Sequence, residues 1–174
     1  MPITGADFTP EMLRIAEKKA EARGAVGRIR FVEADAQDLP FPADHFQLVT
    51  VAFGLRNVAD TDRGLAEMVR VCRPGGRVAV LEFSRPRGVF GTFYRWYFRY
   101  LLPAVGQLIS RSPDSAYRYL PESVMRFPDG EALAEKMRSR GLTEVRYYPF
   151  TFGIATLYVG MKPPAFSGGS ENRR

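Results

Sequence analysis

The sequence is poor in the residues that build disulfide frameworks and metal sites. It contains one cysteine, Cys72, and one histidine, His45, among 174 residues. A single cysteine excludes an internal disulfide, and no spacing of cysteines, histidines or paired carboxylates suggests a metal ion. His45 follows a turn and precedes an apolar segment, so we expect it at the surface rather than in catalysis.

Long hydrophobic runs are also lacking. No uncharged apolar run reaches the roughly 18 residues of a membrane-spanning helix, and residues 1–20 do not resemble a secretory signal. With Cys72 unpaired, these absences favour the reducing cytoplasm. The formal net charge of +6 would suit nucleic acid or an anionic membrane. The arginines are spread along the chain without a basic stripe, however, so we expect no nucleic-acid partner.

What is present predicts one globular domain over residues 1–162, followed by a disordered tail at 163–174. Strand-like and helix-like segments alternate, which predicts an α/β fold with a parallel sheet. The segment FQLVTVAFG has the apolar, β-branched character of a central strand covered on both faces. The expected elements are strands at 3–7, 29–32, 46–54 and 77–84, a helix after a Thr9 cap, and a helix from Asp60 or Thr61 to a stop at Pro74-Gly75-Gly76.

An aromatic-rich segment interrupts this alternation. Residues 88–125 contain VFGTFYRWYFRYLLPAVGQLIS, which predicts an inserted pair of helices, broken at Pro103 and lying over the sheet. The regular pattern returns with a helix that Asp129 caps and Gly141 ends. The segments TEVRYYPF and GIATLYVGM then predict a closing antiparallel hairpin.

Polar residues follow three of the expected strands: Asp7, Asp35 and the Arg56-Asn57 pair. Because parallel strands end at one edge of a sheet, we expect these side chains to line a single crevice, where such sheets bind ligands. Structural alternatives remain open. Asp7 and Asp35 have the character of turn or cap residues, and Arg56 could pair with a surface acid such as Asp60 or Asp62.

The segments GADFTPEML, FVEADAQDLPFP, VTVAFGLRNV and RVCRPGGRVAVLEFSRP resemble successive blocks of the ubiquinone/menaquinone biosynthesis C-methyltransferases. These enzymes are the UbiE type within the class I S-adenosylmethionine-dependent methyltransferases. FGLRNV and PGG...LEFS are specific to that group, and YRYLPESVMRFPD and FGIATLYVG extend the resemblance from about residue 3 to 162. The resemblance implies a Rossmann-like sheet of seven strands, in the order 3-2-1-4-5-7-6.

The resemblance also implies S-adenosylmethionine as cofactor and transfer of its methyl group to a ring carbon of a prenylated quinol. Asp7 would accept hydrogen bonds from the ribose hydroxyls, and Asp35 from the adenine amino group. The Ala36 backbone would meet the adenine edge, while Ala52 and Phe53 would lie near the methionine part. The residues implied in catalysis are Arg56, which would stabilise a phenolate, Asn57, which would orient the ring or a water, and Asp35, toward which that water would relay a proton.

The aromatic insert admits two interpretations. Residues 90–109 could cover an isoprenoid tail or rest on the inner face of the membrane, with Arg95 and Arg99 reaching lipid phosphates, or they could be a plain helical cap. The partners expected are therefore a lipophilic quinol and a membrane surface. A homo-oligomer is left open, as is the choice between a benzoquinol and a naphthoquinol acceptor.

One family feature is absent from the sequence. The resemblance leads us to expect a first strand, a glycine-rich turn and a helix before ITGADF, so the chain corresponds to the C-terminal portion of such an enzyme. Without that strand, residues 3–7 would stay detached, pair with LVTVAFG, or be completed by another chain. We therefore expect weak or no activity from the chain alone. A non-catalytic scaffold in a quinone-synthesis assembly, or another small-molecule methyltransferase, are the alternative functions.

Overall fold

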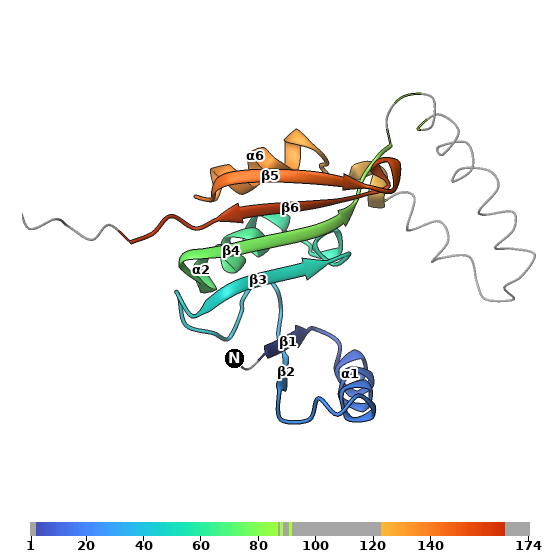
Figure 1. The fold of residues 1–174 in the computed structure, drawn as a ribbon, viewed down its shortest axis with the longest axis vertical. Helices are drawn as coiled ribbons and strands as arrows, with labels where there is room; N and C mark the ends of the chain where they lie inside the picture. Colours follow the sequence, from blue (N-terminus) through green and yellow to red (C-terminus); the bar gives the residue numbers. More distant parts are fainter. Residues whose placement is uncertain (1–2, 87, 89–90, 92–122, 166–174) are drawn as a thin grey trace, which may run out of the picture.

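In the computed structural model, residues 3–86, 88, 91 and 123–165 are described. The first unit consists of β1 (Ile3–Asp7), α1 (Pro10–Ala22) and β2 (Ile29–Glu33). The two strands pair in parallel, with Ile3 opposite Ile29 and Asp7 opposite Glu33. This β-α-β unit confirms the strands and the helix expected there, and Figure 1 shows it beside the larger sheet.

The larger sheet has the strand order β3-β4-β6-β5. Its strands are β3 (Phe46–Ala52), β4 (Cys72–Phe83), β5 (Thr143–Phe150) and β6 (Ala155–Met161). The first two are parallel, whereas β6 runs antiparallel to both β4 and β5. The predicted closing hairpin is therefore confirmed, with a short 3-10 helix, Thr151–Gly153, at its tip.

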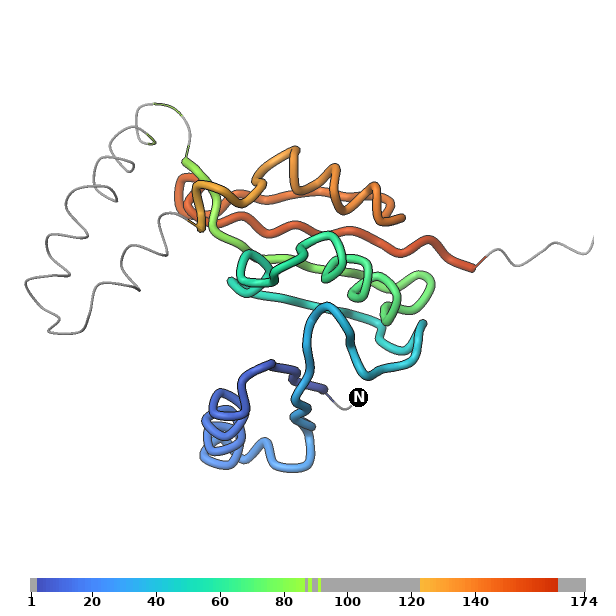
Figure 2. Tube along the Cα trace, turned by 180° about the vertical axis from the view of Figure 1, so that it is seen from behind, coloured from blue at the N-terminus to red at the C-terminus, as the bar shows by residue number. Residues whose placement is uncertain are grey.

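Two helices, α2 (Thr61–Val71) and α6 (Glu131–Ser139), cover the same face of this sheet (Figures 1 and 2). Apolar residues spaced three or four apart on each helix face the strands, as an amphipathic helix requires. The core between the layers contains Leu65, Met68, Val78, Val80, Leu133, Met137 and Tyr158. In the part of the chain that the structure describes, no helix is long and apolar enough to cross a bilayer.

The prediction that Pro74-Gly75-Gly76 stops α2 is wrong, because the helix already ends at Val71 and this tripeptide lies within β4. The carbonyls near the helix end are bound instead by Lys162 of the distant C-terminal strand region. Its ammonium group donates to the carbonyls of Val69, Arg70 and Cys72 at 2.8, 3.3 and 2.8 Å. A cation at a helix C-terminus is also favoured by the helix dipole.

The prediction that Asp129 caps the next helix is also wrong. Its carboxylate binds Arg85, accepting hydrogen bonds from the backbone N–H at 2.7 Å and from the guanidinium at 2.6 and 3.1 Å. The N-cap position belongs to Gly130, whose φ of 57° is in the left-handed region. Gly141 ends α6, as predicted, with a φ of 90°. The insert predicted for residues 88–125 lies almost entirely outside the described residues.

The strand β3 differs from its prediction as a central strand covered on both faces. It pairs with β4 alone, and Leu48 on it is 57% exposed. On the other sheet β1 pairs with β2 alone, and Ile3 is 58% exposed. Of the three arrangements left open for residues 3–7, direct pairing with LVTVAFG is wrong, because β1 pairs with β2 and not with β3. Both strands therefore present an unpaired backbone edge within the described residues.

Gly76 lies where β4 begins to pair regularly with β3, and a side chain has no room there. An added Cβ would lie 2.8 Å from each of three atoms, the carbonyl oxygens of Gln47 and Arg73 and the Cys72 sulfur. We expect Gly76→Ala to lower the free energy of unfolding by about 1–3 kcal/mol, measured by urea denaturation. Gly75 has a φ of +73° and open space around its Cα. Gly75→Asn should leave the free energy of unfolding near the wild-type value, since asparagine tolerates this conformation. Equal losses in the two variants would contradict a steric origin at Gly76.

Candidate functional site

Two carboxylates lie at the carboxyl edge of the small sheet. Asp7 is the last residue of β1, and Asp35 follows β2 by two residues. The Asp7 carbonyl accepts a hydrogen bond from the Ala34 N–H at 3.0 Å, so the two strand ends remain paired up to this point. The parallel register therefore places both acids at one edge, as the sequence predicts.

Both acids also form local turns, which is the alternative that the sequence left open. Asp7 Oδ1 accepts the Thr9 N–H at 2.8 Å, and Thr9 occupies the N-cap position of α1 without using its own side chain. Asp35 Oδ1 accepts the Gln37 N–H at 2.8 Å, and the Gln37 amide reaches both carboxylate oxygens at 3.2 Å. The backbone hydrogen bond and then the side-chain hydrogen bonds from Gln37 lower the pKa of Asp35, so its carboxylate is ionised at neutral pH.

A second polar group lies at the carboxyl end of the large sheet, where a 3-10 helix, Leu55–Asn57, follows β3. Arg56 Nη1 donates to Glu82 Oε2 at 2.9 Å and to the Phe53 carbonyl at 2.5 Å. The Arg56 backbone N–H donates to Glu82 Oε1 at 3.2 Å. The Glu82 side chain is 1% exposed and that of Arg56 10%, so this is a buried ion pair.

The Phe83 ring packs against the guanidinium of this pair. The Phe83 ring centroid lies 5.1 Å from the Arg56 guanidinium carbon, within cation–π range, and 4.5 Å from the Phe53 ring centroid. Phe53 has a φ of 55°. A positive φ is uncommon for a bulky residue, and such backbone conformations cluster at functional sites. Arg56 Nε is buried and has no hydrogen-bond partner among the residues that the structure describes. The site therefore holds a fixed guanidinium with an unused donor.

Glu82, the acid that binds Arg56, is not among the partners that the sequence predicts for this arginine. Asp60 instead caps α2 by accepting the Arg63 N–H at 3.0 Å, and Asp62 forms ion pairs with Lys136 and Arg140. A usable signal was present in the strand pattern. Glu82 continues the buried alternation of Val78 and Val80, and a charged residue in such a register needs a buried partner.

Gln37 connects the two polar groups. While its amide nitrogen binds Asp35, its Oε1 accepts the backbone N–H of Asp60 at 2.9 Å, three residues after Asn57. Asp35 and the Arg56-Asn57 turn are thus linked through one side chain. The roles of Asp7, Asp35, Ala36, Ala52, Phe53, Arg56 and Asn57 in binding or catalysis stay predictions.

Two of the residue types that occur once, histidine and cysteine, are not part of the candidate site. His45 is exposed, as predicted, and its ring meets the edge of Phe46. Cys72 is buried, and this burial raises the pKa of its thiol, which keeps it protonated and unreactive. No group of three potential metal ligands gathers within the ranges that the structure describes.

The Arg56–Glu82 pair can be tested by removing one partner or both. Glu82→Leu should lower the free energy of unfolding by about 3–5 kcal/mol, because it leaves the guanidinium buried and unpaired. Combining it with Arg56→Met should restore most of that loss, since two apolar side chains can replace a buried pair. Urea denaturation of both variants checks this. A double variant as unstable as Glu82→Leu would show that the pair is not the source of the effect.

Comparison with known proteins identifies related sequences over most of the chain. A demethylmenaquinone methyltransferase from Thermus thermophilus is 54% identical, over 92% of this chain and 72% of its own length. Ubiquinone/menaquinone biosynthesis C-methyltransferases UbiE from Geotalea daltonii and Azotobacter vinelandii are each 45% identical, over 92% and 91% of this chain. These matches span 68% and 62% of the two enzymes, so the chain has about two thirds of the length of its relatives.

Solved structures of methyltransferases share the fold. A S-adenosylmethionine-dependent methyltransferase from Thermotoga maritima gives a TM-score of 0.66 at 18% identity, covering 92% of this chain and 72% of its own. Phosphoethanolamine N-methyltransferase 2 from Haemonchus contortus, in complex with S-adenosyl-L-methionine, gives 0.64 at 12% identity, covering 92% and 43%. The model of the ubiE/COQ5 methyltransferase family matches residues 1–162. Thus the chain belongs to the ubiE/COQ5 methyltransferase family, as its sequence motifs predict.

Proposed function

We propose that this protein methylates a ring carbon of a prenylated quinol, with S-adenosylmethionine as the methyl donor. The observation that carries the proposal is the buried Arg56, which Glu82 holds at the end of β3 with a free Nε donor. The names of the relatives support a demethylmenaquinol or a ubiquinol precursor as acceptor.

The acids of the small sheet fit the adenosine part of the cofactor. A vicinal diol and an exocyclic amine can each donate two hydrogen bonds, and Asp7 and Asp35 offer carboxylate oxygens that accept them at one edge. Asp7 uses Oδ1 for the Thr9 N–H, which leaves Oδ2 outside that bond. We assign Asp7 to the ribose, Asp35 and the Ala36 backbone to adenine, and Ala52 and Phe53 to the methionine part.

S-adenosylmethionine, when bound, supplies an electrophilic methyl group on a sulfonium. A quinol ring carbon becomes a good nucleophile when the neighbouring hydroxyl loses its proton and the charge spreads into the ring. Arg56 cannot act as a base at neutral pH, but its guanidinium stabilises the phenolate and so lowers the pKa of that hydroxyl. Glu82 fixes the guanidinium in place, so little reorganisation accompanies the charge that develops.

The proton balance of the reaction assigns the remaining polar residues. The ring carbon forms a bond to the methyl group as the sulfur–methyl bond breaks, and the ring then loses the hydrogen that this carbon carried. Asn57 is exposed on the turn beside Arg56, where its amide could hold the ring hydroxyl or a water. We assign Asp35 as the carboxylate toward which such a water would relay the proton of the ring hydroxyl.

The setting that fits this chemistry is the cytoplasmic face of a membrane, where a lipophilic quinol resides. We assign residues 90–109 to contact with the isoprenoid tail or the bilayer; except for position 91 they are outside the described residues. A scaffold role in a quinone-synthesis assembly is the second candidate. The exposed Ile3 and Leu48 favour it, because apolar strand edges are ready to pair with another chain.

Methyl transfer to a short-chain demethylmenaquinol, followed by mass spectrometry, tests the proposal. The double variant Arg56→Met with Glu82→Leu should keep the fold and bind S-adenosylhomocysteine like wild type, yet transfer methyl groups at least about 100-fold more slowly. Full transfer by this variant would remove Arg56 from catalysis. A folded wild-type chain that binds no S-adenosylhomocysteine in calorimetry would favour the scaffold role.

Asp7 can be tested separately from the chemistry. Asp7→Ala should weaken S-adenosylhomocysteine binding by about 1–3 kcal/mol, because the ribose hydroxyls lose their acceptor. Isothermal titration calorimetry measures this, and Glu11→Gln, an exposed acid in the first turn of α1, is the matched control. Thermal unfolding of both variants corrects for the lost bond to Thr9. Unchanged affinity in Asp7→Ala would remove this residue from the site.

A further inference from the structure

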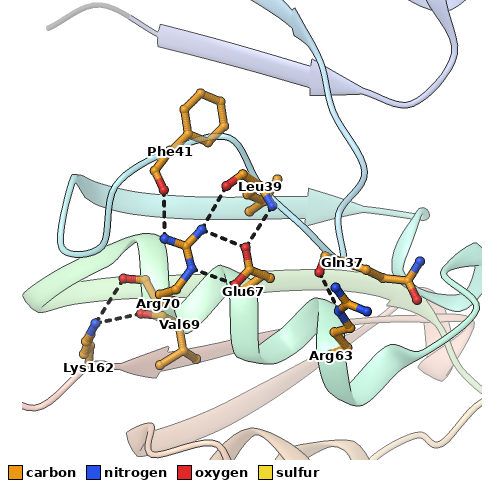
Figure 3. Close-up of polar contacts among 8 residues, drawn as sticks. All are labelled: Gln37, Leu39, Phe41, Arg63, Glu67, Val69, Arg70 and Lys162. Carbon is orange, nitrogen blue, oxygen red and sulfur yellow. Dashed lines mark hydrogen bonds and ion pairs between the residues drawn. The ribbon is translucent and has the colours of Figure 1, made fainter.

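The loop that follows Asp35 is held by side chains of α2 (Figure 3). Glu67 Oε2 accepts the Leu39 N–H at 2.8 Å, and Arg70 Nη2 donates to the Leu39 carbonyl at 2.9 Å. Both backbone groups of one loop residue are thus bound by a single pair of side chains. The arrangement replaces the hydrogen bonds that a neighbouring strand would otherwise make to this residue.

Two more contacts extend this hold along the loop. Arg70 Nη1 donates to the Phe41 carbonyl, and Arg63 Nε donates to the Gln37 carbonyl, each at 2.8 Å. Figure 3 shows the side chains of α2 reaching toward the loop, with their bonds drawn as dashed lines. The loop is therefore bound at Gln37, Leu39 and Phe41, the alternate residues of its path.

The three side chains form one stripe on the helix. Positions 63, 67 and 70 are four and three residues apart, so they share a face, while Leu65 and Met68 point into the core. Arg70 and Glu67 also bind each other, with Nε–Oε1 at 2.6 Å and Nη2–Oε2 at 2.7 Å. The hydrogen bond from Arg70, and then the one from Leu39, lower the pKa of Glu67, which keeps its carboxylate ionised.

The position of this stripe has a consequence for Asp35. β1 and β2 form no ladder with β3, so strand pairing does not fix the small sheet relative to the large one. The loop that α2 holds begins at Gln37, whose backbone and side chain bind the Asp35 carboxylate. Any movement of the loop away from α2 would therefore carry Asp35 away from the Arg56 turn.

We infer that Arg63, Glu67 and Arg70 are positioning residues for the cofactor: they form an α2 clamp that sets Asp35 in place for the adenosine part. This inference rests on the proposed function. None of the three touches Asp35 itself, so the clamp acts through the backbone of residues 37–41. The Arg70–Glu67 pair is part-buried, with side chains 36% and 16% exposed, and both members also bind the loop backbone.

The experiment combines calorimetry with hydrogen exchange on the full chain. Arg70→Met and Glu67→Leu should each raise the Kd for S-adenosylhomocysteine at least tenfold and remove the exchange protection of the Leu39 amide. The amides of Val78 and Val80 in β4 should exchange as in wild type. Glu67→Gln keeps an oxygen that can accept the Leu39 N–H, so it should bind within threefold of wild type.

Asp62→Asn is the matched control, because it breaks ion pairs of the same helix to Lys136 and Arg140 without touching the loop. It should change neither the Kd nor the exchange of Leu39. Wild-type binding together with an unchanged Kd in Arg70→Met and Glu67→Leu would overturn the clamp, even if the Leu39 amide exchanged faster. Absence of binding in the wild-type chain would overturn the proposed function and the cofactor role of the clamp together.

Discussion

Hydrogen bonds from α2 fix the loop of residues 37–41, which joins the two sheets of this protein. The sheets share no strand ladder, so the chain between them depends on side chains for the backbone partners that a strand would supply. Arg70 and Glu67 provide these partners from the helix that also closes the core. The same helix thus packs on the large sheet and binds the loop that follows the small one.

The Arg56–Glu82 pair has a different physical basis. A buried ion pair is weak evidence for stability, because two apolar side chains of similar volume often serve equally well. Retention of a guanidinium in this place is better explained by its chemistry. Glu82 offsets the desolvation of Arg56 and fixes its plane, while Phe83 covers one side of it. The result is a buried cation that is held in one position.

The local features of the fold were predictable from the sequence. Periodicity located β1, α1, β2 and the closing hairpin, and Gly141 marked the end of α6. Predictions failed where a distant residue took over a local role. Lys162 binds the carbonyls at the end of α2, where Pro74-Gly75-Gly76 was expected to stop the helix. Arg85 binds the carboxylate of Asp129, which was expected to cap α6. The prediction that β3 is covered on both faces failed for a related reason. Burial depends on neighbouring elements, which an apolar sequence pattern does not specify.

The residue pattern alone specifies which segments are strands and helices, the family to which the chain belongs, and the strand ends where Asp7, Asp35 and Arg56 lie. These properties follow from residue periods, turn chemistry and motifs that are read within a few neighbouring residues. The partners of the charged groups depend instead on tertiary packing. Glu82, the partner of Arg56, lies 26 positions away along the chain. The loop carbonyls that Arg70 binds lie about as far from it along the chain. Such pairs form because burial makes an unpaired charge unfavourable, and burial exists only once the layers have packed.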